Sequence, residues 1–348
     1  MLRGVITGLS LALVATVAQG QDWITPDACA VSPATYEAAL ASSANETSLA
    51  AADDLAANGH GRLWEVTSPD GETSHLWATM HSSDRLILDL PSELEALIPK
   101  ARMLLVEYDQ LAPSRTVLEQ RNLQAGVWIA PSDPAYKRDY FDRRVLDWVE
   151  ARVEGFLGNA DLMWKLSDAG LAWMLLSDPC EDFAAGILPI QDHRIYLAAY
   201  EAGVPVKGLE NWDAFLTEMS QADRRKTAQA IGEIYGAYLN PEGFSEARAA
   251  GFALYRQGRI GEMVAGDRAY LEDFFGRAKA GKLAALANGY LIGERNTRFL
   301  RAMRRHLDTG GALVAVGAFH LPGDDGLIAL LRGQGYKVTR LVVAGEAP

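Results

Sequence analysis

The chain has 348 residues, of which 49% are hydrophobic and 22% charged, and its formal net charge is −12. This composition is typical of a globular protein that is long enough for one large domain or two small ones. Because an acidic chain repels nucleic acids and anionic lipid headgroups, neither is an expected partner.

Residues 1–20 have the pattern of a secretory signal peptide. Arg3 supplies the positive charge, residues 4–17 are apolar, and small residues precede an expected cleavage site after Gly20. The alternative, a membrane anchor, is disfavoured because the apolar stretch is shorter than the ~20 residues that a membrane span needs. Loss of Arg3 changes the net charge from −12 to −13. We therefore expect a periplasmic or secreted protein without a stable membrane anchor.

Two cysteines, Cys29 and Cys180, are present. In an exported protein such a pair predicts a disulfide bond, here between the start of the mature chain and its middle. Two free thiols are the alternative. Neither cysteine belongs to a pattern with the spacing of metal ligands.

The predicted elements describe a central sheet with a helical insertion. Residues 30–58 predict a helix, residues 63–66 and 75–79 a β-hairpin, residues 92–98 a helix and residues 102–108 a strand. Helical periodicity dominates residues 111–289, with one predicted strand at 204–209. The chain closes with a strand at 313–316, a helix at 324–332 and a strand at 337–343. We expect an α/β fold with a central sheet built from two β-α-β-containing halves, in one domain spanning residues 21–348.

Two histidines and a glutamate occupy matching positions in these halves. His81 and His320 each follow a predicted strand, and Glu107 lies near the end of the apolar strand 102–108. The carboxyl ends of parallel strands share one edge of a sheet, so the three side chains are expected to converge. Neutral imidazoles and a carboxylate bind divalent ions and leave an open position for water. The alternatives are histidines with only structural hydrogen bonds and a solvated carboxylate.

Further polar residues are weaker candidates for the same site. Asp109 would share a strand face with Glu107. Asp192 and Glu210 flank the predicted strand at 204–209. Arg295 and Asn296, which follow Glu294 in a predicted helix, could reach the sheet edge and stabilise an oxyanion. A solvated helix face is the alternative for these three.

Several stretches resemble the TraB/GumN family, whose metal-dependent branch includes the Tiki proteases. They are W-A-T-M-H ending at His81, L-L-V-E-Y-D around Glu107, P-I-Q-D-H-R around Asp192, G-E-R-N ending at Asn296, and V-A-V-G-A-F-H-L-P-G-D-D-G around His320. The chain departs from the family pattern at Ala78 and Ile190, where the family usually has glycine.

The resemblance implies a divalent-metal hydrolase, a peptidase in the Tiki branch. His81, Glu107 and His320 would be the ligands of a manganese, cobalt or zinc ion, and Glu107, Arg295 and Asn296 the catalytic residues. A peptide or protein would be the substrate. Two other readings are a non-catalytic accessory protein that binds a peptide or polysaccharide, and a carrier of a tetrapyrrole or iron with the histidines as axial ligands.

Overall fold

The computed structural model of the chain describes residue 29 and residues 31–45, 58–108, 140–180, 190–211 and 213–346. The predicted signal peptide and Asp109 lie outside these residues. None of the helices in the described part of the chain combines the length and apolar character needed to cross a membrane.

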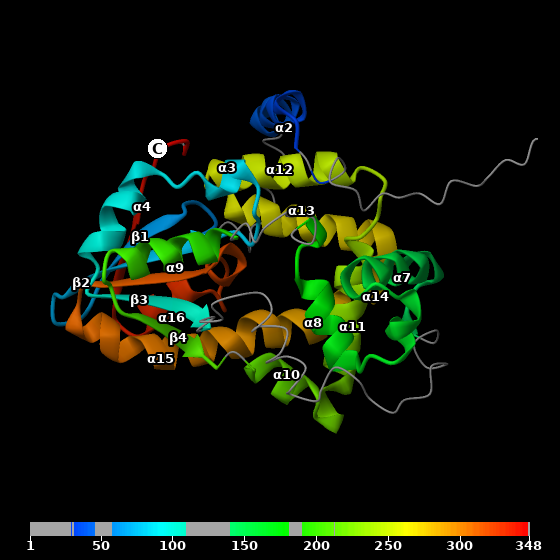
Figure 1. The fold of residues 1–348 in the computed structure, drawn as a ribbon. Helices are drawn as coiled ribbons and strands as arrows, with labels where there is room; N and C mark the ends of the chain where they lie inside the picture. Colours follow the sequence, from blue (N-terminus) through cyan, green and yellow to red (C-terminus); the bar gives the residue numbers. More distant parts are fainter. Residues whose placement is uncertain are drawn as a thin grey trace, which may run out of the picture.

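A six-stranded sheet forms the centre of the fold, with the strand order β4-β3-β5-β2-β1-β6 (Figure 1). Strand β5 runs parallel to β2 and β3, β4 runs parallel to β3, and β1 is antiparallel to β2 and β6. The strands are β1 (Leu63–Thr67), β2 (Thr73–Thr79), β3 (Met103–Tyr108), β4 (Val206–Glu210), β5 (Ala312–Gly317) and β6 (Lys337–Leu341).

The predicted α/β class and helical insertion are confirmed, and the strand predicted at 204–209 is β4, which joins the sheet beside β3. The strand order was not predicted. Strand β5 lies between β3 and β2, so a strand of the second β-α-β-containing half is inserted between two strands of the first. This arrangement makes β2, β5 and β3 parallel neighbours, with their carboxyl ends at one edge.

Helices cover both faces of the sheet. On one face, α4 (Ser92–Leu97) and α9 (Gln191–Glu201) pack on Leu104 and Leu313. On the other face, α15 (Arg295–Thr309) and α16 (Leu327–Gly333) pack on Leu105 and Val314. Successive strand residues alternate between faces, so the two covered faces explain the unbroken apolar run of β5.

A second group of helices lies beside the sheet, and the arrowheads of β3 and β4 point toward it (Figure 1). It has apolar cores of its own, formed largely by α7, α8, α11 and α14. The helices are α7 (Arg143–Leu157), α8 (Asp168–Leu176), α10 (Ala214–Met219), α11 (Arg225–Ala237), α13 (Ile260–Phe275) and α14 (Arg277–Asn288). Helix α12 (Phe244–Arg256) instead adds Phe252 and Tyr255 to the core on the sheet. A π-helical segment, η6 (Gly289–Glu294), then leads into α15.

The remaining helices are short or terminal. They are α2 (Pro33–Asn45), α3 (Arg85–Leu88) and the 3-10 segments η2 (Ile98–Lys100), η3 (Ala160–Trp164), η5 (Ala222–Arg224) and η7 (Ala318–His320). Helix α2 packs against α12 at the top of Figure 1. The predicted disulfide is present: Cys29 and Cys180 are bonded, with their Cα atoms 5.4 Å apart. The bond ties the chain just before α2 to the segment after α8.

Candidate functional site

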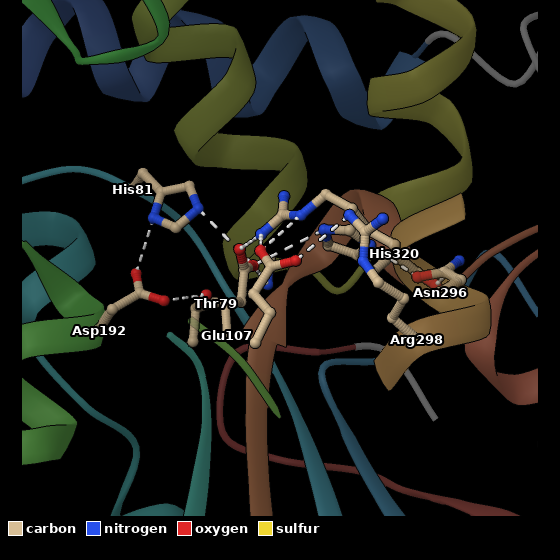
Figure 2. A network of polar contacts seen from close by, with 10 residues as sticks. Thr79, His81, Glu107, Asp192, Asn296, Arg298 and His320 are labelled. Atoms are coloured by element: carbon tan, nitrogen blue, oxygen red, sulfur yellow. Dashed lines mark hydrogen bonds and ion pairs between the residues drawn. The ribbon is translucent and has the colours of Figure 1, made fainter. Parts of the chain in front are cut away.

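The three residues predicted to converge do so at the carboxyl edge of the sheet. His81 lies two residues beyond β2, Glu107 is the penultimate residue of β3, and His320 lies in the single turn η7 that follows β5. Because β5 lies between the other two strands, their ends bring these side chains together. Figure 2 shows His81 and His320 on either side of Glu107.

One carboxylate oxygen is the centre of the cluster. Glu107 Oε1 lies 3.8 Å from His81 Nε2 and 3.7 Å from His320 Nε2. The same oxygen accepts a hydrogen bond of 2.7 Å from the backbone N–H of Gly317. The side chains of Glu107 and His320 are each 6% exposed, whereas that of His81 is 48% exposed. The cluster is therefore reached from the side of His81.

Glu107 is ionised although it is buried. Burial by itself raises the pKa of this carboxyl, but the charge of Arg295, the imidazoles of His320 and His81 when they are protonated, and the Gly317 N–H outweigh it, so its pKa lies well below the usual range. The Arg295 contribution is direct, because its Nη2 donates to Glu107 Oε2 over 2.7 Å. Oε2 is thus engaged by a cation, while Oε1 faces the two histidines.

The hydrogen bonds around Asn296 fix the tautomer of His320. The side-chain N–H groups of Asn296 donate to the carbonyls of His320 at 3.1 Å and Asp325 at 2.7 Å, which leaves its Oδ1 to face His320 Nδ1 at 2.6 Å. Since Oδ1 can only accept, Nδ1 carries the proton. Burial, with Arg295 adding to it, lowers the pKa of His320 to about 3, so the ring is neutral and its Nε2 has a lone pair.

Asp192 has the same effect on His81. Its Oδ1 accepts from the hydroxyl of Thr79 at 2.7 Å, and its Oδ2 lies 3.0 Å from His81 Nδ1. A carboxylate at this distance favours a proton on Nδ1 of His81. In its neutral form with the proton on Nδ1, His81 presents an Nε2 lone pair to Glu107 Oε1.

When both rings are neutral with their protons on Nδ1, three electron-pair donors face one another without a proton between them. Two imidazole nitrogens and an ionised carboxylate oxygen repel one another unless a cation lies among them. Histidine ligands are commonly held in this way, with the second ring nitrogen bonded to a carboxylate or an amide. The donor types and their supporting contacts are of the kinds that metal ligands commonly have.

Gly317 keeps the centre of the cluster open. A Cβ atom at this position would lie 3.1 Å from Glu107 Oε1, 3.5 Å from His81 Nε2 and 3.6 Å from His320 Cδ2. Its φ of −51° is available to any residue, so the glycine matters here for space, because a Cβ would crowd Glu107 Oε1. In the sequence, Gly317 is only one residue of a motif. The proximity of Gly317 to all three side chains depends on the fold.

The weaker candidates differ in how close they lie to the cluster. Asp192 and Asn296 hold the histidines, while Glu210 lies one step away and binds Arg295 at 2.6 Å and Arg298 at 3.4 Å. Glu294 is not part of the cluster, because it pairs with Arg224 at 2.7 Å and is 42% exposed. Asp109 lies outside the described residues.

Gln191 is a buried residue that joins α9 to the end of β2 and was not among the predicted site residues. Its Oε1 accepts from the Trp77 indole, the Met80 N–H and the Tyr255 hydroxyl, and its Nε2 donates to the carbonyl of Ile87. These bonds fix the chain just before His81. Only the position of Gln191 beside Asp192 in the sequence could have pointed to it.

Within the described residues, no group of three or more histidine, cysteine, aspartate and glutamate side chains is placed so that it could hold a metal ion. What the fold and site define is an α/β protein with a histidine–glutamate cluster at the carboxyl edge of its sheet. The sequence profile of the TraB/PrgY/gumN family matches residues 62–340, and the chain belongs to this family, as its motifs predicted. Neither the curated proteins nor the solved structures include a match to the chain.

Proposed function

We propose that this protein is an exported, divalent-metal-dependent hydrolase of peptide bonds, with His81, Glu107 and His320 as the ligands of the ion. The observation that carries the proposal is the convergence of two imidazole Nε2 atoms on one carboxylate oxygen. Family membership agrees with it. The disulfide between Cys29 and Cys180 supports export, because such bonds persist in oxidising compartments.

The distances in the cluster are close to those that an ion requires. Ligands at about 2.1 Å from a tetrahedral ion lie about 3.4 Å from one another. The two nitrogen–oxygen distances of 3.7 and 3.8 Å exceed this value by a few tenths of an ångström. A small rotation of the imidazoles would close the difference, and the half-exposed His81 has room to make it. Two nitrogens and one oxygen, without a thiolate, suit manganese, cobalt or zinc.

When bound, the ion would polarise the substrate carbonyl and make water a nucleophile at neutral pH. The chain's own residues prepare the site. Arg295 neutralises Glu107 Oε2, Asn296 orients His320, and Asp192 orients His81.

The positions of Arg295 and Asn296 favour a role other than the predicted stabilisation of an oxyanion. The Asn296 side chain is fully buried behind His320, and its amide is occupied by three hydrogen bonds. Nη2 of Arg295 binds both Glu107 and Glu210. We therefore assign both as positioning residues that keep the ligands in place.

The variant Gly317→Ala tests the proposed site without replacing any of the three proposed ligands. Its methyl group would enter the space that the three ligands share, so cobalt or zinc titrations should show at least a tenfold loss of affinity. The matched control is Gly281→Ala in α14, where a Cβ meets no other atom within 4 Å. The fold of both variants is checked by circular dichroism.

Two results would contradict the proposal. If Gly317→Ala binds the ion as tightly as the wild type, the three residues do not hold it. If the wild type binds an ion but cleaves no peptide in a mixed fluorogenic library, the protein is a binding or accessory protein and hydrolysis is wrong.

A further inference from the structure

A small open pocket lies beside Glu107. His81 and Glu107 line it together with three planar side chains, Tyr108, His193 and Tyr196. The ring of His81 is half-exposed, while His320 is buried. A substrate that enters the pocket therefore lies beside these three rings and the exposed side of the cluster.

The fold explains why the rings gather there. Tyr108 ends β3 and, by strand alternation, points to the same face as Val106, which is the face covered by α9. His193 and Tyr196 are three residues apart on α9 and share one side of that helix, while Ile195 and Ala199 pack into the sheet core. The Tyr108 ring is supported from α8 by Trp173, with centroids 6.3 Å apart.

His193 supplies the pocket with a polar group as well as a flat face. Its ring is half-buried and makes no hydrogen bond or ion pair with any other residue that the structure describes. Ligand pockets typically combine apolar or aromatic walls with a few polar groups that fix orientation. Tyr108, Tyr196 and His193 together have this character.

We propose that this pocket is the specificity pocket of the site, and that a flat aromatic side chain of the peptide, next to the bond that is cleaved, stacks against its rings from the open side. The proposal rests on the proposed function, because His81 and Glu107, which line the pocket, belong to the proposed ion site. Tyr196 and Tyr108 would contact the ring of the substrate, and His193 would orient it through a hydrogen bond. None of the three is a proposed ligand of the ion.

Hydroxamates test this pocket without knowledge of the natural substrate, because they bind divalent ions through two oxygens and carry a variable group. We would load the mature protein with cobalt and titrate it with acetohydroxamate and benzohydroxamate, following the visible bands of the cobalt ion. Contacts between aromatic rings predict about three- to tenfold tighter binding of benzohydroxamate. Tyr196→Ala should lose this preference and Tyr196→Phe should keep it, both at unchanged cobalt content.

Tyr200→Ala is the matched control, because Tyr200 lies on the same helix and is 67% exposed. It should behave as the wild type, and His193→Ala should weaken binding of benzohydroxamate more than that of acetohydroxamate. Equal affinities for the two hydroxamates in the wild type, or a preference that persists in Tyr196→Ala, would overturn the specificity pocket and leave the ion site standing. If the wild type binds no cobalt, the proposed function fails, and the specificity pocket fails with it.

Discussion

Replacement of Asn296 by alanine tests how the chain holds its buried histidine. Asn296 makes three hydrogen bonds, at 2.6 Å to His320 Nδ1, 3.1 Å to the His320 carbonyl and 2.7 Å to the Asp325 carbonyl. Each bond contributes about 1 kcal/mol to stability. Since alanine makes none of them, the free energy of unfolding should fall by about 3 kcal/mol.

The same substitution should weaken ion binding for a separate reason. Without Asn296 Oδ1, the proton of His320 can move to Nε2, and the ring loses its fixed orientation. Loss of such a supporting group typically costs about 10- to 100-fold in metal affinity. Two measurements separate the effects: urea unfolding in the presence of a chelator gives the stability of the apoprotein, and cobalt titration gives the affinity.

Asn296→Asp is the matched variant. Its carboxylate can still accept the proton of His320 Nδ1 but cannot donate to the two carbonyls. We expect a loss of stability similar to that of Asn296→Ala, with a cobalt affinity within about tenfold of the wild type. If Asn296→Ala loses stability yet binds cobalt as the wild type does, Asn296 is a structural residue only and the tautomer argument is wrong.

Two further predictions concern His320 and the disulfide. The pKa of His320 is about 3 in the folded chain against 6.5 for an ordinary histidine, so the unfolded state binds a proton that the native state excludes, and stability should fall as the pH drops from 6.5 toward 3. In chelator, the stability difference between the wild type and His320→Gln should change by up to about 1.4 kcal/mol per pH unit in this range, and a constant difference would contradict the pKa shift. Replacement of Cys29 and Cys180 by serine should lower the free energy of unfolding by about 2–5 kcal/mol, because the bond closes a loop with a sequence separation of 151 residues. Equal stability of the wild type with and without a reductant would argue against that value.

Much of the sheet edge could be predicted because its signals are local. The apolar run before Gly317 marked a buried strand, and a histidine just beyond such a strand lies at the carboxyl edge wherever the strand is placed. Glu107 stood out because a carboxylate in an apolar strand needs a partner. These three positions did not depend on knowing the strand order.

The supporting contacts could not be predicted, because they depend on how distant segments pack. Asp192 holds His81 only because α9 lies on the sheet face beside the end of β2, which also places Gln191 under the same turn. Asn296 was expected to face the substrate, but the way α15 packs against the end of β5 places it behind His320. A sequence pattern specifies that a helix exists and which face is apolar, and does not specify which neighbouring strand end a given polar residue meets.

Measurement of the bound ion gives the most direct test of the proposed metal site. The metal content of the purified mature protein would be measured by mass spectrometry after equilibration with manganese, cobalt or zinc and removal of the free ion, in parallel with Glu107→Gln. Glutamine keeps the shape of Glu107 and removes the charge that faces the two imidazoles. We expect one tightly held ion per chain in the wild type and none in Glu107→Gln. A wild type without a bound ion, or a variant that holds the ion equally well, would contradict it.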